Sequence, residues 1–245
     1  GFMGAGVLVD GSARQSPAPG SRFEATGHAQ GFALEGLGLL WAGAADDTLT
    51  ALTHAQGGAG PGGAAWLINA GGNDRYELAN TRVVQASSQL PERNASMGQG
   101  AGRGWRGRGG APDVPGGMGL LVDLAGDDHY TAQVFAQGVG FQQGLGVLID
   151  AGGRNRHDAA WYALGAAAHQ AVGVFWASGQ GDDEYSLSHA SGLGAATDQS
   201  LGWFEDVGGD DRLAVVPFSQ GQAAGGSVAR CKTRAQSAGS VPCSR

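Results

Sequence analysis

The sequence has few cysteines, one lysine and no long apolar run. Cys231 and Cys243 are the only cysteines, and Lys232 is the single lysine. A net charge of −7 argues against a general nucleic-acid binder, which would carry a basic stripe. No apolar run approaches the roughly 18 residues that a membrane-spanning helix needs. We therefore expect neither a membrane span nor a nucleic-acid partner.

The position of the two cysteines bears on the compartment. Both lie in the final fifteen residues, where a short-loop disulfide would tie down the tail. Such a disulfide favours an oxidising compartment, although two unrelated thiols are the alternative. The chain begins at Gly1 without Met, which fits the removal of an upstream segment such as a signal peptide. These features predict a secreted protein, extracellular or periplasmic.

Glycine is abundant, with 47 residues, and it follows a repeat. There is no Gly-X-Y period, which excludes collagen. Two sets of residues recur at intervals of about 27 residues. One set lies in an acidic turn, and the other closes an Ala-Gln-Gly element. The acidic set is Asp47, Asp74, Asp128, Asn155, Asp183 and Asp211, and the glycine set is Gly31, Gly57, Gly138, Gly165, Gly192 and Gly221. Asp74 and Asp128 are 54 residues apart, which is twice the repeat length of 27. We therefore expect one central coil without the motif between them.

The repeat unit predicts strands rather than helices. Residues 144–150, GLGVLID, alternate in the period of two that is typical of a strand. Stacking one unit per turn gives an all-β parallel β-solenoid (parallel β-helix) of seven to nine coils. We expect the solenoid to cover residues 1–221, with a long loop excursion at about 77–116. Residues 222–245 are predicted to be a C-terminal tail.

The same alternation predicts two faces for each strand. We expect the bulky set, such as Leu145, Val147 and Ile149, to point into the solenoid. The other set, such as Gly146 and Leu148, would then form a flat apolar stripe. Such a stripe is either a second packed layer within the chain or a docking face.

Aspartates end the first strand of the unit and follow its Gly-rich turn. Stacked carboxylates repel one another unless turn amides cap them or a hard cation lies between coils. Both interpretations stay open, and calcium is the only cofactor considered. The candidate metal ligands are Asp74, Asp123, Asp128, Asp150, Asp183, Asp206 and Asp211.

A second polar set suggests a catalytic pair. Aligning residues 140–144, 167–171 and 196–200 places His169 beside Asp198 on adjacent coils. A carboxylate can orient an imidazole, as in general bases, but a structural hydrogen bond is the alternative. Ser200 is near in sequence, yet no nucleophile is clearly placed. The glutamines of this set, Gln142, Gln143, Gln170 and Gln199, are candidate ligand-binding residues.

Two further sets concern rings and arginines. A ring file, expected to stack rather than to bind metal, comprises His28, His54, Phe135, Tyr162, His189 and Phe218. The predicted excursion carries Arg103, Trp105, Arg106 and Arg108, which suit an anionic or sugar-like ligand. A plain surface loop is the alternative for this segment.

The unit G-x-L-x-D-x-x-G-x-D-x-Y, followed by A-Q-G, resembles a repeat of exported bacterial proteins. Residues from Gly116 to Asp211 carry it best, and weaker copies extend back to Gly4. The resemblance implies the solenoid fold over most of the chain. No activity is established for this repeat, so no catalytic residue can be carried over.

Three functions remain open from the sequence. The preferred one is a structural or binding module that presents a repetitive face to a polymer, a protein partner or its own copies. The second is a polysaccharide-active enzyme that uses His169 and Asp198, which is analogy at the level of the fold. The third is a subunit of a larger assembly with the Gly-Leu stripe as its interface.

Overall fold

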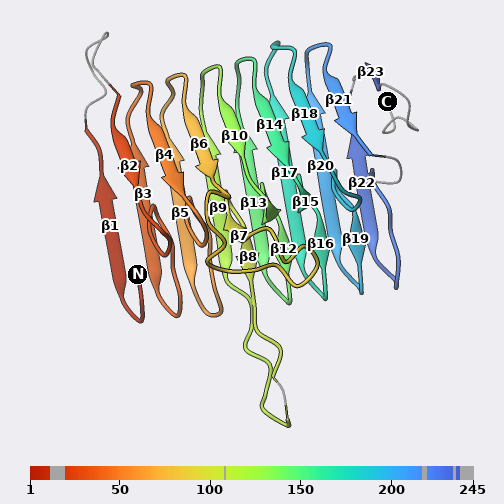
Figure 1. Cartoon of the computed structure of the whole chain (residues 1–245). Helices are drawn as coiled ribbons and strands as arrows, with labels where there is room; N and C mark the ends of the chain where they lie inside the picture. The colour runs from red at the N-terminus through yellow and green to blue at the C-terminus, as the bar shows by residue number, and fades with distance from the viewer. Residues whose placement is uncertain (12–19, 108, 217–219, 234–235, 238–245) are drawn as a thin grey trace.

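The computed structural model describes residues 1–11, 20–107, 109–216, 220–233 and 236–237. Strands, turns and bends make up this part of the chain, with no helix among them. The strands stack as a parallel β-solenoid of about eight turns (Figure 1). Within the same residues no helix is long and apolar enough to cross a membrane. The predicted fold class is therefore confirmed.

Two sheets run the length of the solenoid. The first sheet contains β1 (Ala5–Val9), β3 (Leu37–Ala42), β5 (Ala64–Asn69), β9 (Met118–Asp123), β13 (Leu145–Asp150), β17 (Val172–Ser178), β20 (Leu201–Val207) and β22 (Val228–Lys232). The second contains β2 (Arg22–Glu24), β4 (Thr48–Ala51), β6 (Arg75–Leu78), β10 (His129–Thr131), β14 (Arg156–Ala159), β18 (Glu184–Leu187), β21 (Arg212–Val215) and β23 (Gln236–Ser237).

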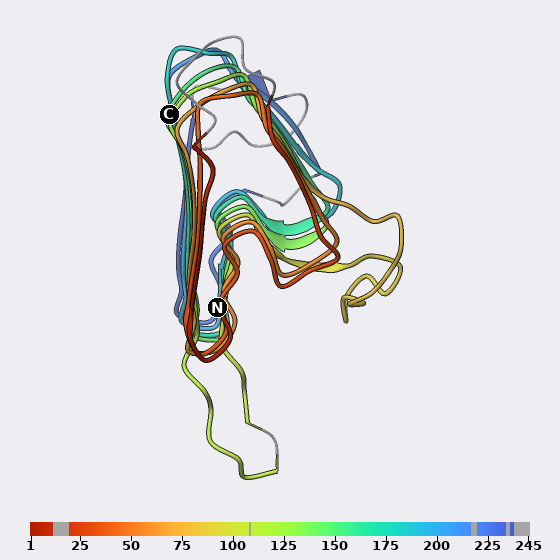
Figure 2. The ribbon, with the colours of Figure 1, turned by 90° about the vertical axis from the view of Figure 1, so that its left-hand side faces the viewer.

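Two shorter sheets complete the coils. The third sheet contains β7 (Ala95–Gly98), β11 (Val134–Ala136) and β15 (Trp161–Ala163). The fourth contains β8 (Gly102–Arg103), β12 (Gly140–Phe141), β16 (Ala167–Ala168) and β19 (Ala196–Thr197). Viewed along the stack, the first sheet shows little twist from coil to coil (Figure 2).

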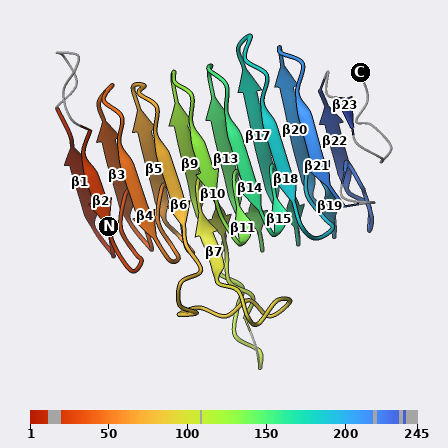
Figure 3. The same ribbon diagram turned by 45° about the horizontal axis from the view of Figure 1, so that its top comes forward.

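The central region contains two insertions rather than an extra coil. β5 pairs directly with β9 and β6 with β10, so the coil expected between them does not exist. Within the predicted excursion, β7 and β8 still pair with β11 and β12. The chain leaves the stack before β7 and again in a hairpin where Trp105 pairs with Val114 (Figure 3). Together the insertions add about one repeat length, so the spacing between Asp74 and Asp128 is still a multiple of 27 residues.

The solenoid also continues past the boundary predicted at residue 221. β22 pairs with β20 in register, and β23 pairs with β21. Cys231 is buried against the core and is disulfide-bonded. Cys243 lies outside the described residues, as do Arg108 and Phe218.

The inward and outward faces of the first sheet are the reverse of those expected. In β13, Gly146, Leu148 and Asp150 are buried, whereas Leu145, Val147 and Ile149 are partly exposed. The prediction that the bulky set points inward is therefore wrong. The Gly-Leu stripe is the internal packed layer, so it cannot be a docking face. Alternation shows which residues share a face, but it does not show which face is inside.

Glycine in this stripe allows two backbones to meet without side chains between them. A Cβ built on Gly146 would lie 2.0 Å from the carbonyl oxygen of Val139, and one on Gly173 would lie 2.1 Å from that of Ala166. The Ala-Gln-Gly element therefore packs directly against the first sheet. Gly138, at φ +78, adopts a left-handed conformation at the turn of this element.

The wider part of each coil holds the side-chain core. Leu148 on the first sheet is fully buried, as are its equivalents in the neighbouring coils. From the second sheet, Tyr76 stacks on Tyr130 with centroids 4.7 Å apart, and Tyr130 stacks on His157 at 4.4 Å. Equivalent residues thus lie above one another, as a solenoid requires.

Replacing Leu148 with Ala tests which face is inside. We expect Leu148→Ala to lower the free energy of unfolding by about 2–5 kcal/mol, because it leaves a cavity in a fully buried layer. Val147→Ala, one residue away and outward, should lower it by less than about 1 kcal/mol. Chemical denaturation measures both, and a larger loss for Val147→Ala would contradict the assigned faces.

Candidate functional site

The inner aspartate of each turn caps the backbone of the preceding coil. The backbone N–H of Asp74 donates to Oδ1 of Asp128 at 2.7 Å. The N–H of Asp128 donates to Oδ1 of Asn155 at 2.9 Å, and that of Asn155 to Asp183 at 2.7 Å. These carboxyl and amide groups are buried. The turn-capping interpretation of this file therefore has direct geometric support.

The outer residue of each turn makes the reciprocal bond. The N–H of Asp127 donates to Oδ1 of Asn73 at 2.9 Å, and that of Arg154 donates to Oδ1 of Asp127 at 2.8 Å. Farther along, Asp210 donates to Asp182 in the same way at 2.9 Å. In the Asp46–Asp47, Asp127–Asp128 and Asp182–Asp183 pairs, one side chain reaches toward the next coil's turn and the other toward the previous one. The pairing thus joins adjacent coils in both directions.

Two groups of three carboxyls are close enough to hold a cation. Asp74, Asp123 and Asp128 offer oxygens within 4.8 Å of one another, as do Asp183, Asp206 and Asp211. The remaining candidate ligand, Asp150, instead accepts a hydrogen bond from Asn155 at 2.8 Å.

Hydrogen bonds already occupy most oxygens of the first group. Both oxygens of Asp74 and both of Asp123 accept protein donors, including the Tyr76 hydroxyl at 2.6 Å from Asp123. One oxygen of Asp128 accepts the Asp74 amide. Calcium prefers six to eight oxygens, so an ion would have to share or displace these donors. The geometry therefore suits capping without an ion better.

Burial raises the pKa of several of these carboxyls above the ordinary value. Desolvation raises the pKa of Asp74 to about 8 and that of Asp206 to about 8. It raises the pKa of Asp183 to about 6 and, together with the neighbouring Asp123, that of Asp128 to about 10. Without a cation, several of these groups are therefore protonated near neutral pH.

The polar edge, formed by Gln142, Gln143, His169, Gln170, Asp198 and Gln199, lies where the fourth sheet turns into the first. All six residues have positive φ. His169 Nδ1 lies 2.5 Å from Asp198 Oδ2, so the structure brings together the pair predicted to be neighbours. Gln143 donates to Gln170 at 3.2 Å, and Gln170 donates to Gln199 at 3.3 Å. Non-glycine residues in this strained conformation are frequent at functional sites.

The polar edge lacks a nucleophile. Ser200 is buried, and its Oγ accepts the Ala171 amide at 3.1 Å. The same hydroxyl donates to the Asp198 carbonyl at 3.4 Å. A serine held in this way caps the turn and is not presented to a substrate. The His169–Asp198 pair can exchange a proton, but Ser200 is not in a position to complete a triad.

The predicted arginine and tryptophan residues divide between two places. Arg103 is partly buried on β8, and Trp105 and Arg106 are exposed at the base of the hairpin. Trp105 lines a pocket together with Arg103, His28 and His54. The stacking of His28 on His54, at 5.0 Å and 17°, agrees with the predicted ring file. The residues from neighbouring coils that complete this pocket were not predicted as a group.

The outward face of the first sheet, here called the apolar face, presents apolar side chains that repeat from coil to coil. Along its rows, from β1 to β22, the only charged residues are Glu205, Arg230 and Lys232, which lie in the last two strands. The rows are Ala5, Leu37, Ala64, Met118, Leu145, Val172, Leu201 and Val228; Val7, Leu39, Trp66, Leu120, Val147, Val174, Trp203 and Arg230; and Val9, Trp41, Ile68, Val122, Ile149, Trp176, Glu205 and Lys232. Met118 is 48% exposed, Trp41 41% and Trp176 37%.

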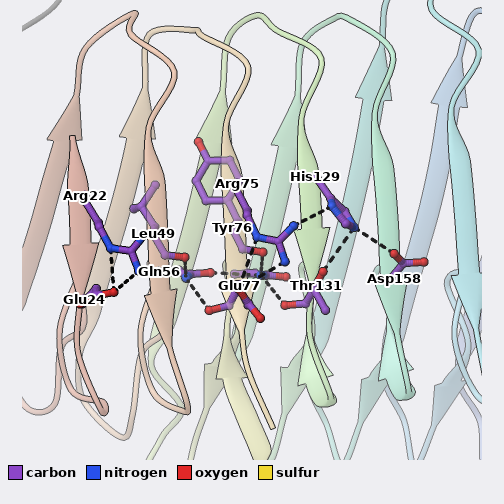
Figure 4. Close-up of polar contacts among 11 residues, drawn as sticks. Arg22, Glu24, Leu49, Gln56, Arg75, Tyr76, Glu77, His129, Thr131 and Asp158 are labelled. Carbon is purple, nitrogen blue, oxygen red and sulfur yellow. Dashed lines mark hydrogen bonds and ion pairs between the residues drawn. The ribbon is translucent and has the colours of Figure 1, made fainter. Parts of the chain in front are cut away.

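The outward face of the second sheet is charged instead. Arg75 pairs with Glu77 at 3.3 Å, and His129 pairs with Asp158 at 3.0 Å (Figure 4). Arg156 also reaches Asp158, at 2.7 Å. The outward face of the second sheet is thus charged, whereas that of the first sheet is apolar. The apolar rows are therefore a property of one face and do not reflect the general composition.

The sequence matches no protein-family model, and no match is found among curated proteins or solved structures. The resemblance to an exported bacterial repeat stays a prediction.

The raised carboxyl pKa values predict that stability falls as pH rises. The folded state holds protons on Asp74, Asp128 and Asp206 that the unfolded chain releases above about pH 4. In EDTA, we expect the melting temperature to decrease from pH 4 to pH 8. Asp128→Asn should reduce this decrease, because it removes one titrating group and keeps the acceptor. A melting temperature that rises across this range would contradict the assignment.

Proposed function

We propose that the chain is an exported structural module that assembles through its apolar face, with a second copy as the partner. One observation carries this proposal: an eight-stranded sheet faces outward with rows of aliphatic and aromatic side chains. Extended patches of this kind on soluble proteins are typical of interaction sites.

The size of the apolar face supports a protein partner. Eight strands spaced about 4.8 Å apart, each about 20 Å long, give roughly 700 Å². A stable protein interface buries about 800 Å² on each partner. The little-twisted sheet could pack face to face on a copy of itself, as in a sheet sandwich. Polymer binding is less favoured, because these rows offer few hydrogen-bonding groups to a hydroxylated chain.

The exported location rests on the bonded state of Cys231. A disulfide persists in oxidising compartments such as the periplasm or the extracellular space. The charged face and the net charge of −7 favour solubility of such an assembly.

An enzyme acting on a polysaccharide through His169 and Asp198 is the alternative function. The 2.5 Å contact between the two side chains favours it. Against it stand the buried, turn-capping Ser200 and the open edge on which His169 is half-buried and Asp198 exposed. We therefore rank the enzyme below the structural module.

Disrupting the apolar face should separate the copies. Light scattering coupled to size exclusion should show the native chain as a dimer or larger. Val147→Lys should yield a monomer, because it places a charge at the centre of the buried interface. Thr50→Lys, outward on the second sheet, is the matched control and should leave the assembly unchanged.

Two results would contradict this proposal. One is a native chain that remains monomeric at every concentration. The other is an equal effect of Thr50→Lys and Val147→Lys. If the native chain sediments with insoluble cellulose or chitin and Val147→Lys does not, the partner of the apolar face is a polymer rather than a second copy.

We also propose that turn capping, rather than calcium, holds the acidic files together. EDTA should then leave the melting temperature at pH 7.4 within about 1 °C, and added calcium should not raise it. A bound ion at 100 times its dissociation constant would instead stabilise the chain by about 2.7 kcal/mol. A calcium-dependent rise that disappears in Asp128→Asn would establish the calcium alternative.

A further inference from the structure

A pocket lies beside the hairpin, apart from the apolar face. Its volume is about 240 Å³, and it is lined by His28, Phe32, His54, Arg103 and Trp105 among others. None of the lining residues is acidic, although the chain carries a net charge of −7. The pocket is therefore locally basic and is large enough for one small ring-shaped molecule.

Arg103 brings a charge into this pocket, where the described residues supply no counter-ion. Its guanidinium lies 5.9 Å from the centre of the Phe141 ring, and no carboxylate of the described chain pairs with it. Burial lowers the pKa of Arg103. A partly desolvated cation without a partner is costly, and an anionic ligand would offset that cost with two parallel hydrogen bonds.

His54 supplies an acceptor beside this cation. The Thr53 hydroxyl donates to the Ala95 carbonyl at 2.6 Å and lies 2.7 Å from His54 Nδ1. Because the hydroxyl has a single proton, Nδ1 must donate to it, which leaves Nε2 as an acceptor. Burial, with smaller effects of His28 and Arg103, lowers the pKa of His54 to about 4, so the ring is neutral at pH 7.

Two aromatic rings, with small and aliphatic residues such as Leu34 and Pro61, form the remaining walls. Phe32 is 5% exposed and packs edge-on against His28 at 4.9 Å and His54 at 5.7 Å. Trp105 is 49% exposed and lines the same pocket. Rings of this kind cover the apolar faces of a ligand, while a few placed polar groups fix its orientation.

We infer that this pocket binds a small anionic sugar, a sugar acid or a sugar phosphate. Arg103 binds the anionic group, the His54 Nε2 accepts a ligand hydroxyl, and the rings cover the sugar. The site is independent of assembly through the apolar face, so either proposal can fail without the other.

Calorimetric titration of the full chain tests the pocket. The probes are glucuronate, glucose 6-phosphate, neutral glucose and inorganic phosphate. We expect one or both of the sugar anions to bind with a stoichiometry of one, and glucose and phosphate to bind much more weakly. Arg103→Gln should weaken binding by about 10- to 100-fold, the value of a charge-assisted hydrogen bond.

Matched variants distinguish the pocket from its surroundings. Arg106→Gln, on the same hairpin but outside the pocket, should leave affinity unchanged, whereas Trp105→Ala should lower it. Melting temperatures confirm that each variant is folded. The inference is overturned if neither sugar anion binds, if glucose or phosphate binds as tightly, or if Arg106→Gln weakens binding as much as Arg103→Gln.

Discussion

The whole solenoid depends on the reciprocal hydrogen bonds between the turns of adjacent coils. In the Asp127–Asp128 pair, the inner side chain accepts an amide from the coil before it, and the outer side chain accepts one from the coil after it. These bonds satisfy buried backbone donors that the turn would otherwise leave without partners. They also fix the rise from one coil to the next, and with it the register of both long sheets.

This fixed register explains the two contrasting outer faces. Because each strand lies in register with the next, equivalent positions form continuous rows. On the second sheet these rows become ion pairs such as Arg156 with Asp158, whereas on the first they stay apolar. When the repeat places the same type of residue at one outward position of every coil, these residues therefore form an entire row across the sheet. The apolar face and the pocket are both consequences of this stacking, and the pocket arises where the insertions interrupt it.

Much of the fold could be predicted, because the repeat length places equivalent residues on neighbouring coils. The same count placed His169 beside Asp198 before any geometry was known, and the two side chains do meet. The inward face could not be predicted from alternation, since Leu148 and Val147 are both apolar. The missed signal was Asp150, which shares its face with Leu148 and is held inside the turn by Asn155. The pocket was missed because the insertion between β6 and β7 breaks the repeat spacing between His54 and Arg103.

Amide hydrogen exchange measured by NMR tests the central interaction most directly. The backbone amides of Asp74, Asp128 and Asn155 lie in Gly-rich turns, where exchange is ordinarily fast, yet each donates to a buried side chain of the next coil. The structure predicts that these three amides exchange as slowly as those in the centres of β9 and β13. Exchange as fast as that of Gly109 and Gly110, at the tip of the hairpin, would contradict it.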